Sequence, residues 1–241
     1  MNAAAIRCAL PLLLLGAGVA VFAARADSTT PAPLPNLDYT YNGDAMGMSL
    51  GEVRIALKPE GAPGCYRYTN TSNPSGLVKM LYGSANQTSL FCLKDGRIRS
   101  QRFESVLQGD AKQSYTLAFD WDKHTVTDNN GQVRDIPDDA IDSFALQQAV
   151  RLWVLAHAND AKPPIAEFTM VDSKNLTHYQ FKFSGHQKID TPAGSFDTLL
   201  MERTDNPDKI GRFWLAPDRG YMPVRTETKG GKALVTLVLA K

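Results

Sequence analysis

Apolar and polar side chains alternate along several short stretches of this chain, and glycine-containing pairs separate many of these stretches. A period of two places every second side chain on the same face of a strand, so the pattern predicts strands with one buried face. The pairs Asp95-Gly96, Asn130-Gly131 and Gly230-Gly231 tolerate the positive φ angles that tight hairpins require. The sequence therefore predicts an antiparallel sheet of consecutive hairpins. The alternating sets are Tyr39/Tyr41, Val53/Ile55/Leu57, Tyr115/Leu117/Phe119/Trp121 and Tyr179/Phe181/Phe183.

The last apolar run, residues 233–239, has almost no polar position. Strands of this composition are typical of positions that are buried on both faces. We therefore expect the chain to end in a strand that is covered on both sides.

Residues 140–158 break the alternation, because their apolar side chains recur at helical spacing. Asp138 or Asp139 can cap the start of such a helix, and the prolines at 163 and 164 prevent its continuation. A helix that is apolar around much of its circumference needs contact on more than one side. The main stripe is Ile141, Phe144/Ala145, Ala149, Leu152 and Ala156, while Leu146, Val150 and Val154 lie off it.

A shorter helix is expected over residues 74–82, where Asn73 can cap the first turn and Pro74 suits the first helical position. Together these patterns predict a mainly β fold, either a strongly curved antiparallel sheet or an open β-barrel. One long helix packs on this sheet or in it.

The first 26 residues have the order of properties that is typical of a signal peptide. Arg7 precedes an uncharged apolar run over residues 8–24, and an Ala-x-Ala pattern ends at Ala26. We therefore expect cleavage before Asp27 and export of the mature chain. A retained membrane anchor is the alternative, but the run is shorter than the roughly 20 residues that span a bilayer.

The mature chain is expected to contain a proline-rich leader, residues 27–36, and a single β-rich domain over 37–241. The signal peptide removes two arginines and no acid, which leaves 24 basic and 25 acidic residues and a formal charge of −1. This balance gives no reason to expect nucleic acid as a partner. We expect an exported, soluble protein and not an integral membrane protein.

Cys65 and Cys92 are the two cysteines that remain after cleavage, and an exported chain meets an oxidising compartment. If residues 74–82 are helical, strands near 65–72 and 86–93 can pair antiparallel with the two cysteines opposite each other. Opposed positions are within disulfide range. The sequence therefore predicts a Cys65–Cys92 disulfide.

Motifs that carry chemistry are weak in this sequence. Residues 47–51, GMSLG, match the G-x-S-x-G nucleophile elbow, but that motif needs a strand-to-helix turn and the flanking pattern here is β, which favours a hairpin turn. The four histidines lack metal-ligand spacing. The carboxylates of DIPDDAID, residues 135–142, favour helix capping over Ca²⁺ binding. We therefore expect no catalytic residue, no metal and no cofactor.

Large apolar side chains are the remaining candidates for a site. They either line an apolar groove between the long helix and the concave face of the sheet, or simply form the core. As groove candidates we select Phe119, Trp121, Phe144, Leu152, Trp153, Phe181 and Trp214.

Several short segments, in this order, carry a resemblance to a known family. The chain resembles the exported bacterial family catalogued as domain of unknown function 3108. The resemblance implies a Gram-negative periplasmic location and an open β-barrel similar to the lipoprotein carriers LolA and LolB, and it implies no catalytic residue. The carrying segments are Phe119-Asp120-Trp121, residues 139–143 (DAIDS), 191–196 (TPAGSF) and 213–218 (FWLAPD), and Pro223-Val224.

Three hypotheses follow. The first is a periplasmic, non-catalytic binding or carrier protein for a lipid, a lipoprotein or another apolar ligand of the cell envelope. The second is an envelope scaffold or accessory protein whose core is filled by its own side chains, with an envelope protein as its partner. The third is an enzyme that acts on cell-wall or polysaccharide material through two carboxylates in a cleft.

Overall fold

The computed structural model describes residues 34–45, 47–74, 84–108, 113–229 and 234–241, all within the compact unit Pro31–Lys241. The expected signal peptide with its cleavage point, and all but the first residue of the helix expected over 74–82, lie outside these residues. Leu34, at the end of the expected leader, is buried, and its N–H donates to the Tyr66 hydroxyl at 2.8 Å.

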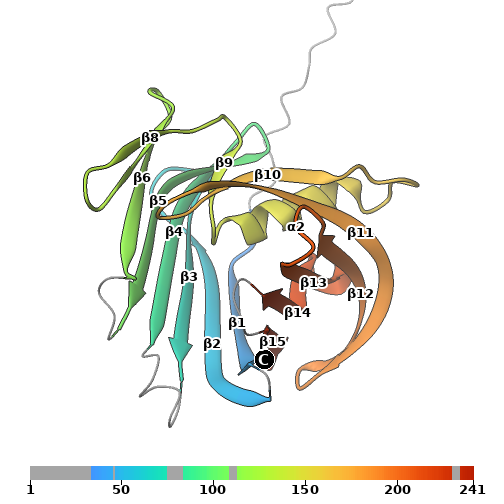
Figure 1. The fold of residues 1–241 in the computed structure, drawn as a ribbon. Coiled ribbons are helices and arrows are strands. Elements are labelled where there is room, and N and C mark those ends of the chain that lie inside the picture. Colours follow the sequence, from blue (N-terminus) through green and yellow to red (C-terminus); the bar gives the residue numbers. More distant parts are fainter. Residues whose placement is uncertain (1–33, 46, 75–83, 109–112, 230–233) are drawn as a thin grey trace, which may run out of the picture. The chain divides into compact units, whose positions relative to one another are not determined.

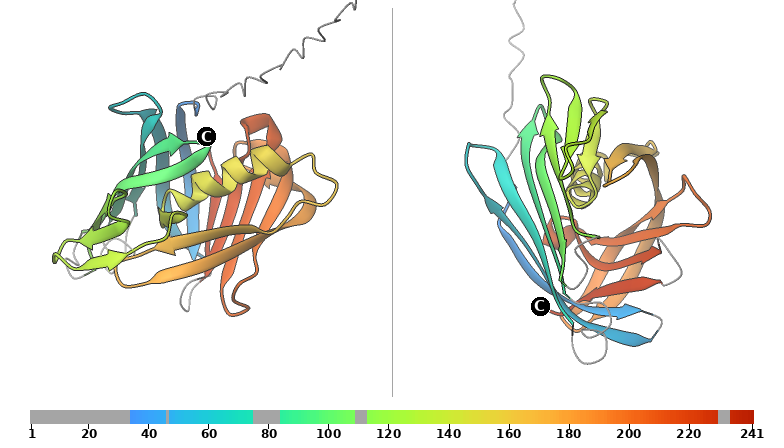
Figure 2. Two further views of the ribbon diagram at one scale, coloured as in Figure 1. Left: turned by 90° about the horizontal axis from the view of Figure 1, so that it is seen from above. Right: turned by 60° about the vertical axis from the view of Figure 1, so that its left-hand side comes forward.

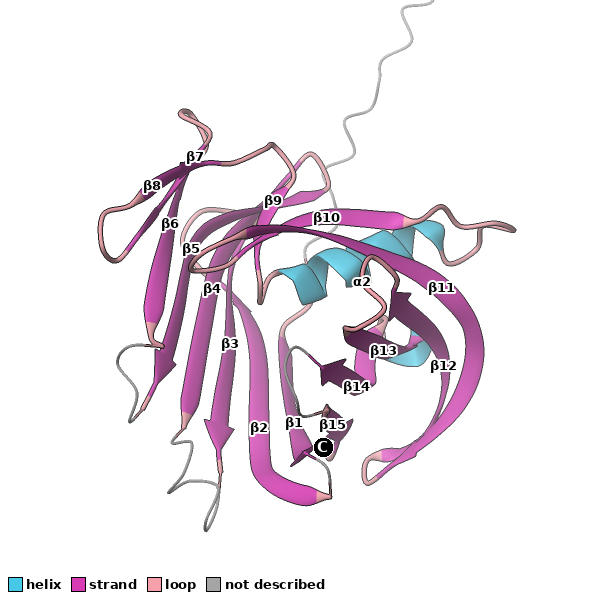
Figure 3. Cartoon of the chain, in the orientation of Figure 1, coloured by secondary structure: helices cyan, strands magenta, loops and turns pink. Residues whose placement is uncertain are grey.

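Within the described residues, 15 strands form one sheet in the order β8-β7-β6-β5-β4-β3-β2-β1-β15-β14-β13-β12-β11-β10-β9 (Figures 1 and 3). Each neighbouring pair is antiparallel except β9 and β10, which are parallel. The first half is β1 (Leu37–Ala45), β2 (Met48–Pro59), β3 (Cys65–Asn73), β4 (Ala85–Lys94), β5 (Arg97–Leu107), β6 (Tyr115–Asp120), β7 (Thr125–Asp128) and β8 (Val133–Asp135). The second half is β9 (Ala140–Asp142), β10 (Ala166–Val171), β11 (Leu176–Thr191), β12 (Gly194–Arg203), β13 (Ile210–Ala216), β14 (Met222–Lys229) and β15 (Val235–Leu239).

The alternating sets lie in strands, as the sequence predicts. In β2, Val53, Ile55 and Leu57 are buried while Arg54 is exposed. The period of two thus turns one face of the strand toward the core. The mainly β fold class is therefore confirmed.

The β4–β5 hairpin follows from the Asp95-Gly96 pair, whose φ angles of 52° and 74° are those of a two-residue turn with both central residues left-handed. One strand earlier, Cys65 pairs with Cys92 between β3 and β4, and the two form a disulfide. Both the predicted bond and the predicted register are confirmed.

The sheet is strongly curved but not closed by backbone hydrogen bonds. Its two halves face each other across the side on which the helix α2 (Leu146–His157) lies (Figure 2). β9, at one end of the strand order, contacts β5 in the opposite half without pairing with it. In β11 the register shifts between Phe183 and His186, and such a bulge bends a strand.

The expectation of a helix from residue 140 is wrong, because α2 begins at Leu146. Ala140–Asp142 instead form β9 and pair with Thr169–Val171 of β10. Asp138 and Asp139 therefore precede a strand. The Asp142 carboxylate accepts the backbone N–H groups of Phe144 and Ala145, at 2.9 and 2.8 Å, just before the helix.

The expectation that the last strand is buried on both faces is also wrong. In β15 only Leu239 is buried, and Val235–Val238 are half-buried. The described fold has a single sheet layer with its core on the concave side, so no second layer covers the outer face of β15.

Candidate functional site

Helix α2 carries apolar side chains on two sides. Leu146, Val150 and Val154, which lie off the main sequence stripe, are the residues buried in the core. Ala149, Leu152 and Ala156 of the main stripe lie on the opposite side of the helix, and Leu152 is half-buried. The core therefore buries one apolar side of this helix and covers the stripe through Leu152 only in part.

A groove with a volume of about 540 Å³ lies where the Leu152 side of α2 meets β5, β9 and β10. We call it the α2 groove. Its apolar lining has the spacing i, i+3, i+4, i+7 on the helix, and the strands β9 and β10 add two further apolar side chains. The apolar residues are Ala149, Leu152, Trp153 and Ala156 of α2, Ile141 of β9, Phe168 of β10 and Ile98 of β5.

The rim of the α2 groove is rich in carboxylates. Asp95 comes from the β4–β5 turn, Asp138 and Asp139 from the loop before β9, and Glu167 from β10. Arg97 and the backbone of Gly96 come from the same hairpin as Asp95, and His157 comes from the last turn of α2. An apolar floor therefore lies beside several charged groups from separate parts of the sequence.

A smaller recess of about 110 Å³ lies at the C-terminal end of α2. Trp153 and His157 line both this recess and the α2 groove, and β11 contributes Phe183 and His186 to the recess. The Trp153 and His157 rings are 4.7 Å apart, and His157 Nδ1 is 2.7 Å from Asp160 Oδ2. The Trp153 ring thus stands where the two hollows meet.

The structure divides the seven side chains selected from the sequence. Leu152 and Trp153 lie together on the α2 groove. Trp121 is half-buried, donates its indole N–H to the Ser100 carbonyl at 2.7 Å and lies under the Arg99 guanidinium. The other four are core residues that are at most 9% exposed: Phe119, Phe144, Phe181 and Trp214.

Sequence reasoning missed Phe168 and the four rim carboxylates as neighbours of Leu152 and Trp153. The helical stripe was visible in the sequence. Its neighbours come from β4–β5, β9 and β10, and no local pattern joins those segments.

Two buried polar side chains, Asp142 and Arg151, connect β9 and α2 to other parts of the fold. Asp142 of β9 accepts hydrogen bonds from the hydroxyls of Ser89 and Ser100, at 2.7 and 2.6 Å. Burial raises the pKa of Asp142, and the hydrogen bond from Ser100 opposes this rise. On the core side of α2, Arg151 donates from Nε to the Gly220 carbonyl at 2.6 Å. Burial lowers the pKa of this guanidinium.

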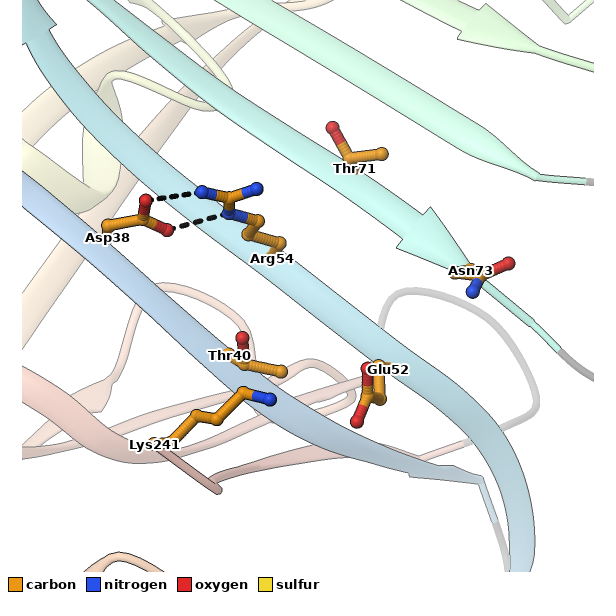
Figure 4. Close-up of a pocket in the computed structure, with 7 residues that line it drawn as sticks. All are labelled: Asp38, Thr40, Glu52, Arg54, Thr71, Asn73 and Lys241. Atoms are coloured by element: carbon orange, nitrogen blue, oxygen red, sulfur yellow. Dashed lines mark hydrogen bonds and ion pairs between the residues drawn. The ribbon is translucent and has the colours of Figure 1, made fainter.

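A second hollow, of about 530 Å³, lies on β1, β2 and β3 beside the C-terminal residue (Figure 4). Its lining residues are all polar or charged. Arg54 makes two hydrogen bonds to the Asp38 carboxylate, and this bonding lowers the pKa of Asp38. Because it lacks an apolar floor, this surface is a poorer candidate than the α2 groove for an apolar ligand. Its residues are Asp38, Thr40, Glu52, Arg54, Thr71, Asn73 and Lys241.

The remaining motifs have structural explanations. Gly47 of the GMSLG segment, with φ 82°, lies in the turn between β1 and β2, and the other four residues begin β2, so the segment has β structure on both sides and no strand-to-helix turn. In the part of the chain that the structure describes, no three His, Cys, Asp or Glu side chains are grouped as metal ligands. None of the described helices is long and apolar enough to cross a membrane.

Solved structures of three bacterial proteins match this chain to different degrees. A β-barrel-like protein of the DUF1849 domain family from Brucella abortus is 11% identical with a TM-score of 0.56, over 87% of this chain and 97% of that chain. A candidate lipoprotein from Parabacteroides distasonis is 16% identical with a TM-score of 0.38, over 87% and 96%. A candidate exported protein with a YmcC-like fold from Bacteroides fragilis is 15% identical with a TM-score of 0.33, over 86% and 97%. The first likeness shows a shared fold, and the other two are too weak to show one.

No curated protein matches the sequence of this chain. The sequence model of one family, however, matches residues 37–237, nearly the whole of the expected domain. The predicted resemblance is thereby confirmed, and the chain belongs to the family described as protein of unknown function, DUF3108.

Proposed function

We propose that the protein is a non-catalytic binding or carrier protein of the periplasm, and that the α2 groove holds the apolar part of a lipid, a lipoprotein or another apolar ligand. One observation carries the proposal: α2 presents a second apolar stripe that the core covers only in part, and this stripe lines the groove. The signal-peptide pattern of residues 1–26 supports the periplasmic location.

The dimensions of the groove suit a small apolar ligand. Its volume of about 540 Å³ is within the range of roughly 300–1,000 Å³ that is usual for ligand sites. Complete burial of one large apolar side chain stabilises by about 1.5–3 kcal/mol. Covering the half-exposed Leu152 and Trp153 therefore supplies a driving force for binding.

The test uses the mature chain, residues 27–241, freed of lipid and titrated calorimetrically with dodecyl maltoside below its critical micelle concentration. We expect saturable binding. Ala156→Trp fills the groove from an exposed helix position, so it should weaken binding about tenfold, the loss of about 1.4 kcal/mol. Ala161→Trp, in an exposed loop outside the groove, is the matched control and should bind as the wild type does. Absence of saturable binding, with a thermal midpoint that ignores added ligand, overturns the proposal.

One observation favours a scaffold as the second candidate. The space between Tyr41, Met222 and Leu239 admits no sphere of the size of water, and four of the seven selected groove residues are buried in the core. The interior of the sheet is thus filled at this point by its own side chains, as in small barrels. If the protein is a scaffold, the α2 groove binds no small ligand. The titration with dodecyl maltoside therefore decides between the carrier and the scaffold function.

A further inference from the structure

We propose that the ligand of the α2 groove is a cationic amphiphile, an apolar chain whose head group is an ammonium or guanidinium. This inference rests on the proposed function and names the chemistry of its ligand. The argument comes from the charges that surround the apolar floor, and from the partners those charges have within the described residues.

The charged groups that line the groove are mostly acidic. Four carboxylates stand against the single guanidinium of Arg97, so the lining carries a formal charge of −3 when His157 is neutral. His157 Nδ1 lies 2.7 Å from the Asp160 carboxylate, so its imidazole already has an acidic partner outside the groove lining. The excess is negative and comes from three separate segments: Asp95, then Asp138 and Asp139, then Glu167.

Nearby cations offset only part of this charge. Asp138 lies 3.5 Å from an Arg99 nitrogen and 3.3 Å from His124 Nδ1. If the Arg99 charge is counted in full, the groove still carries an excess of two negative charges. Among the described residues, Asp95 and Asp139 have no cation within ion-pair distance.

Asp139 and Glu167 are held in place by neutral donors. The Thr169 hydroxyl donates to Asp139 at 2.8 Å, and the Gln180 amide donates to Glu167 at 2.8 Å. The nearest imidazole nitrogen to Glu167 belongs to His178, at 3.9 Å. These hydrogen bonds orient the carboxylates and leave their charges largely uncompensated, so a cation that enters beside the apolar floor meets an acidic rim.

The groove thus combines the two features that a cationic amphiphile requires. The stripe of α2 and Phe168 contact its chain, while Asp139 and Glu167 contact its head group. An anionic amphiphile is disfavoured, because its head group approaches like charges. Attraction between exposed charges weakens with salt, so the preference for a cation should shrink at high ionic strength.

The test compares three probes with the same twelve-carbon chain, all below their critical micelle concentrations: dodecyltrimethylammonium, dodecyl maltoside and dodecanoate. At low salt we expect the mature protein to bind the ammonium probe about 3- to 10-fold more tightly than the maltoside, and dodecanoate most weakly. At 0.5 M NaCl the three affinities should converge.

Asp139→Asn combined with Glu167→Gln removes two rim charges and keeps one acceptor oxygen in each side chain. This pair should lower affinity for the ammonium probe about 3- to 10-fold and leave the maltoside unchanged. Asp197→Asn with Asp208→Asn makes the same change in net charge at exposed positions outside the groove, and should change neither affinity. Equal binding of the ammonium and maltoside probes by the wild type overturns the charge inference and leaves the proposed function standing. If none of the three probes binds saturably, both fail.

Discussion

Asp142 of β9 accepts a hydrogen bond of 2.6 Å from the hydroxyl of Ser100 in β5, 42 residues earlier in the chain. Ser100 Oγ in turn accepts the backbone N–H of Asp142 at 3.0 Å. β9 and β5 belong to opposite halves of the sheet and do not pair through their backbones. This reciprocal contact, with a second bond from Ser89, therefore connects the two halves where the sheet stays open. It also fixes the strand that carries Ile141 to the α2 groove.

Asp142→Ala is predicted to destabilise the fold strongly. The substitution leaves two buried hydroxyls and two backbone N–H groups without their acceptor, and unsatisfied buried groups cost about 1–3 kcal/mol each when nothing relaxes. We expect a loss of about 3–5 kcal/mol in the free energy of unfolding, measured by urea denaturation. Asp135→Ala, at an exposed position of β8, should change it by about 0.5 kcal/mol or less. Equal effects of the two substitutions contradict the prediction.

The pH dependence of stability should report the burial of Asp142. Its pKa in the folded protein is raised above the ordinary value of 3.8, chiefly by burial. The folded state then binds the proton more tightly than the unfolded chain, so stability falls as the pH rises from the unfolded to the folded pKa. Asp142→Asn does not titrate. The wild type should therefore lose stability relative to this variant as the pH rises from about 3, with a constant difference once the pH exceeds the folded pKa of Asp142. A difference that grows in favour of the wild type over the same interval contradicts the direction of the shift.

The disulfide is predicted to stabilise the fold by about 3.5 kcal/mol in the chain-entropy model, because Cys65 and Cys92 are 27 positions apart in sequence. The strands β3 and β4 already pair these residues, so the double substitution Cys65→Ser, Cys92→Ser should keep the native circular dichroism spectrum while its unfolding midpoint falls. Wild-type protein with a reductant should behave in the same way. An unchanged midpoint in both samples contradicts the prediction.

Gly51→Ala is predicted to cost more than Gly96→Ala, although both glycines have positive φ. A Cβ on Gly51 lies 2.5 Å from the Asn73 carbonyl oxygen, whereas a Cβ on Gly96 meets no atom within 4 Å. The Gly96 variant bears only the left-handed strain, about 1–2 kcal/mol, and the Gly51 variant adds a backbone clash. Thermal unfolding should rank them in that order. Ser49→Ala should be near neutral, because its hydroxyl only accepts the Gly51 N–H at 3.3 Å on the surface.

Local patterns in the sequence are sufficient to predict the strands and the disulfide, because apolar alternation and hairpin-forming pairs are properties of neighbouring residues. The start of α2 is different. Ala140–Asp142 fit a helical stripe, and only pairing with β10, some thirty residues later, makes them a strand. The same holds for the candidate site. Leu152 and Trp153 can be chosen from the helix alone, but Phe168 and Asp95 reach them through tertiary structure.

The buried side of α2 could not be predicted completely from the sequence either. It contains polar residues, and hydrophobic periodicity does not predict that polar residues are buried. Gln148 and Arg151 are buried there. The guanidinium Nη1 donates to the Gln148 amide oxygen at 3.2 Å, and Nε donates to the carbonyl of Gly220, 69 residues later. Burial of Arg151 thus depends on acceptors that the sequence does not reveal.

Arg151 gives the last prediction, since no carboxylate among the described residues lies within ion-pair distance of its buried guanidinium. Arg151→Met removes the buried charge, keeps most of the volume and leaves the Gly220 carbonyl without its donor, which costs about 1–3 kcal/mol. Arg151→Lys keeps the charge but replaces a planar fork with a compact, strongly hydrated ammonium that cannot reach both acceptors. We therefore expect the lysine variant to be the less stable of the two, with a loss of about 3 kcal/mol or more in urea denaturation. Arg102→Met, at an exposed position of β5, should change stability by about 0.5 kcal/mol or less. A lysine variant that is more stable than the methionine variant means that α2 requires a positive charge at this position.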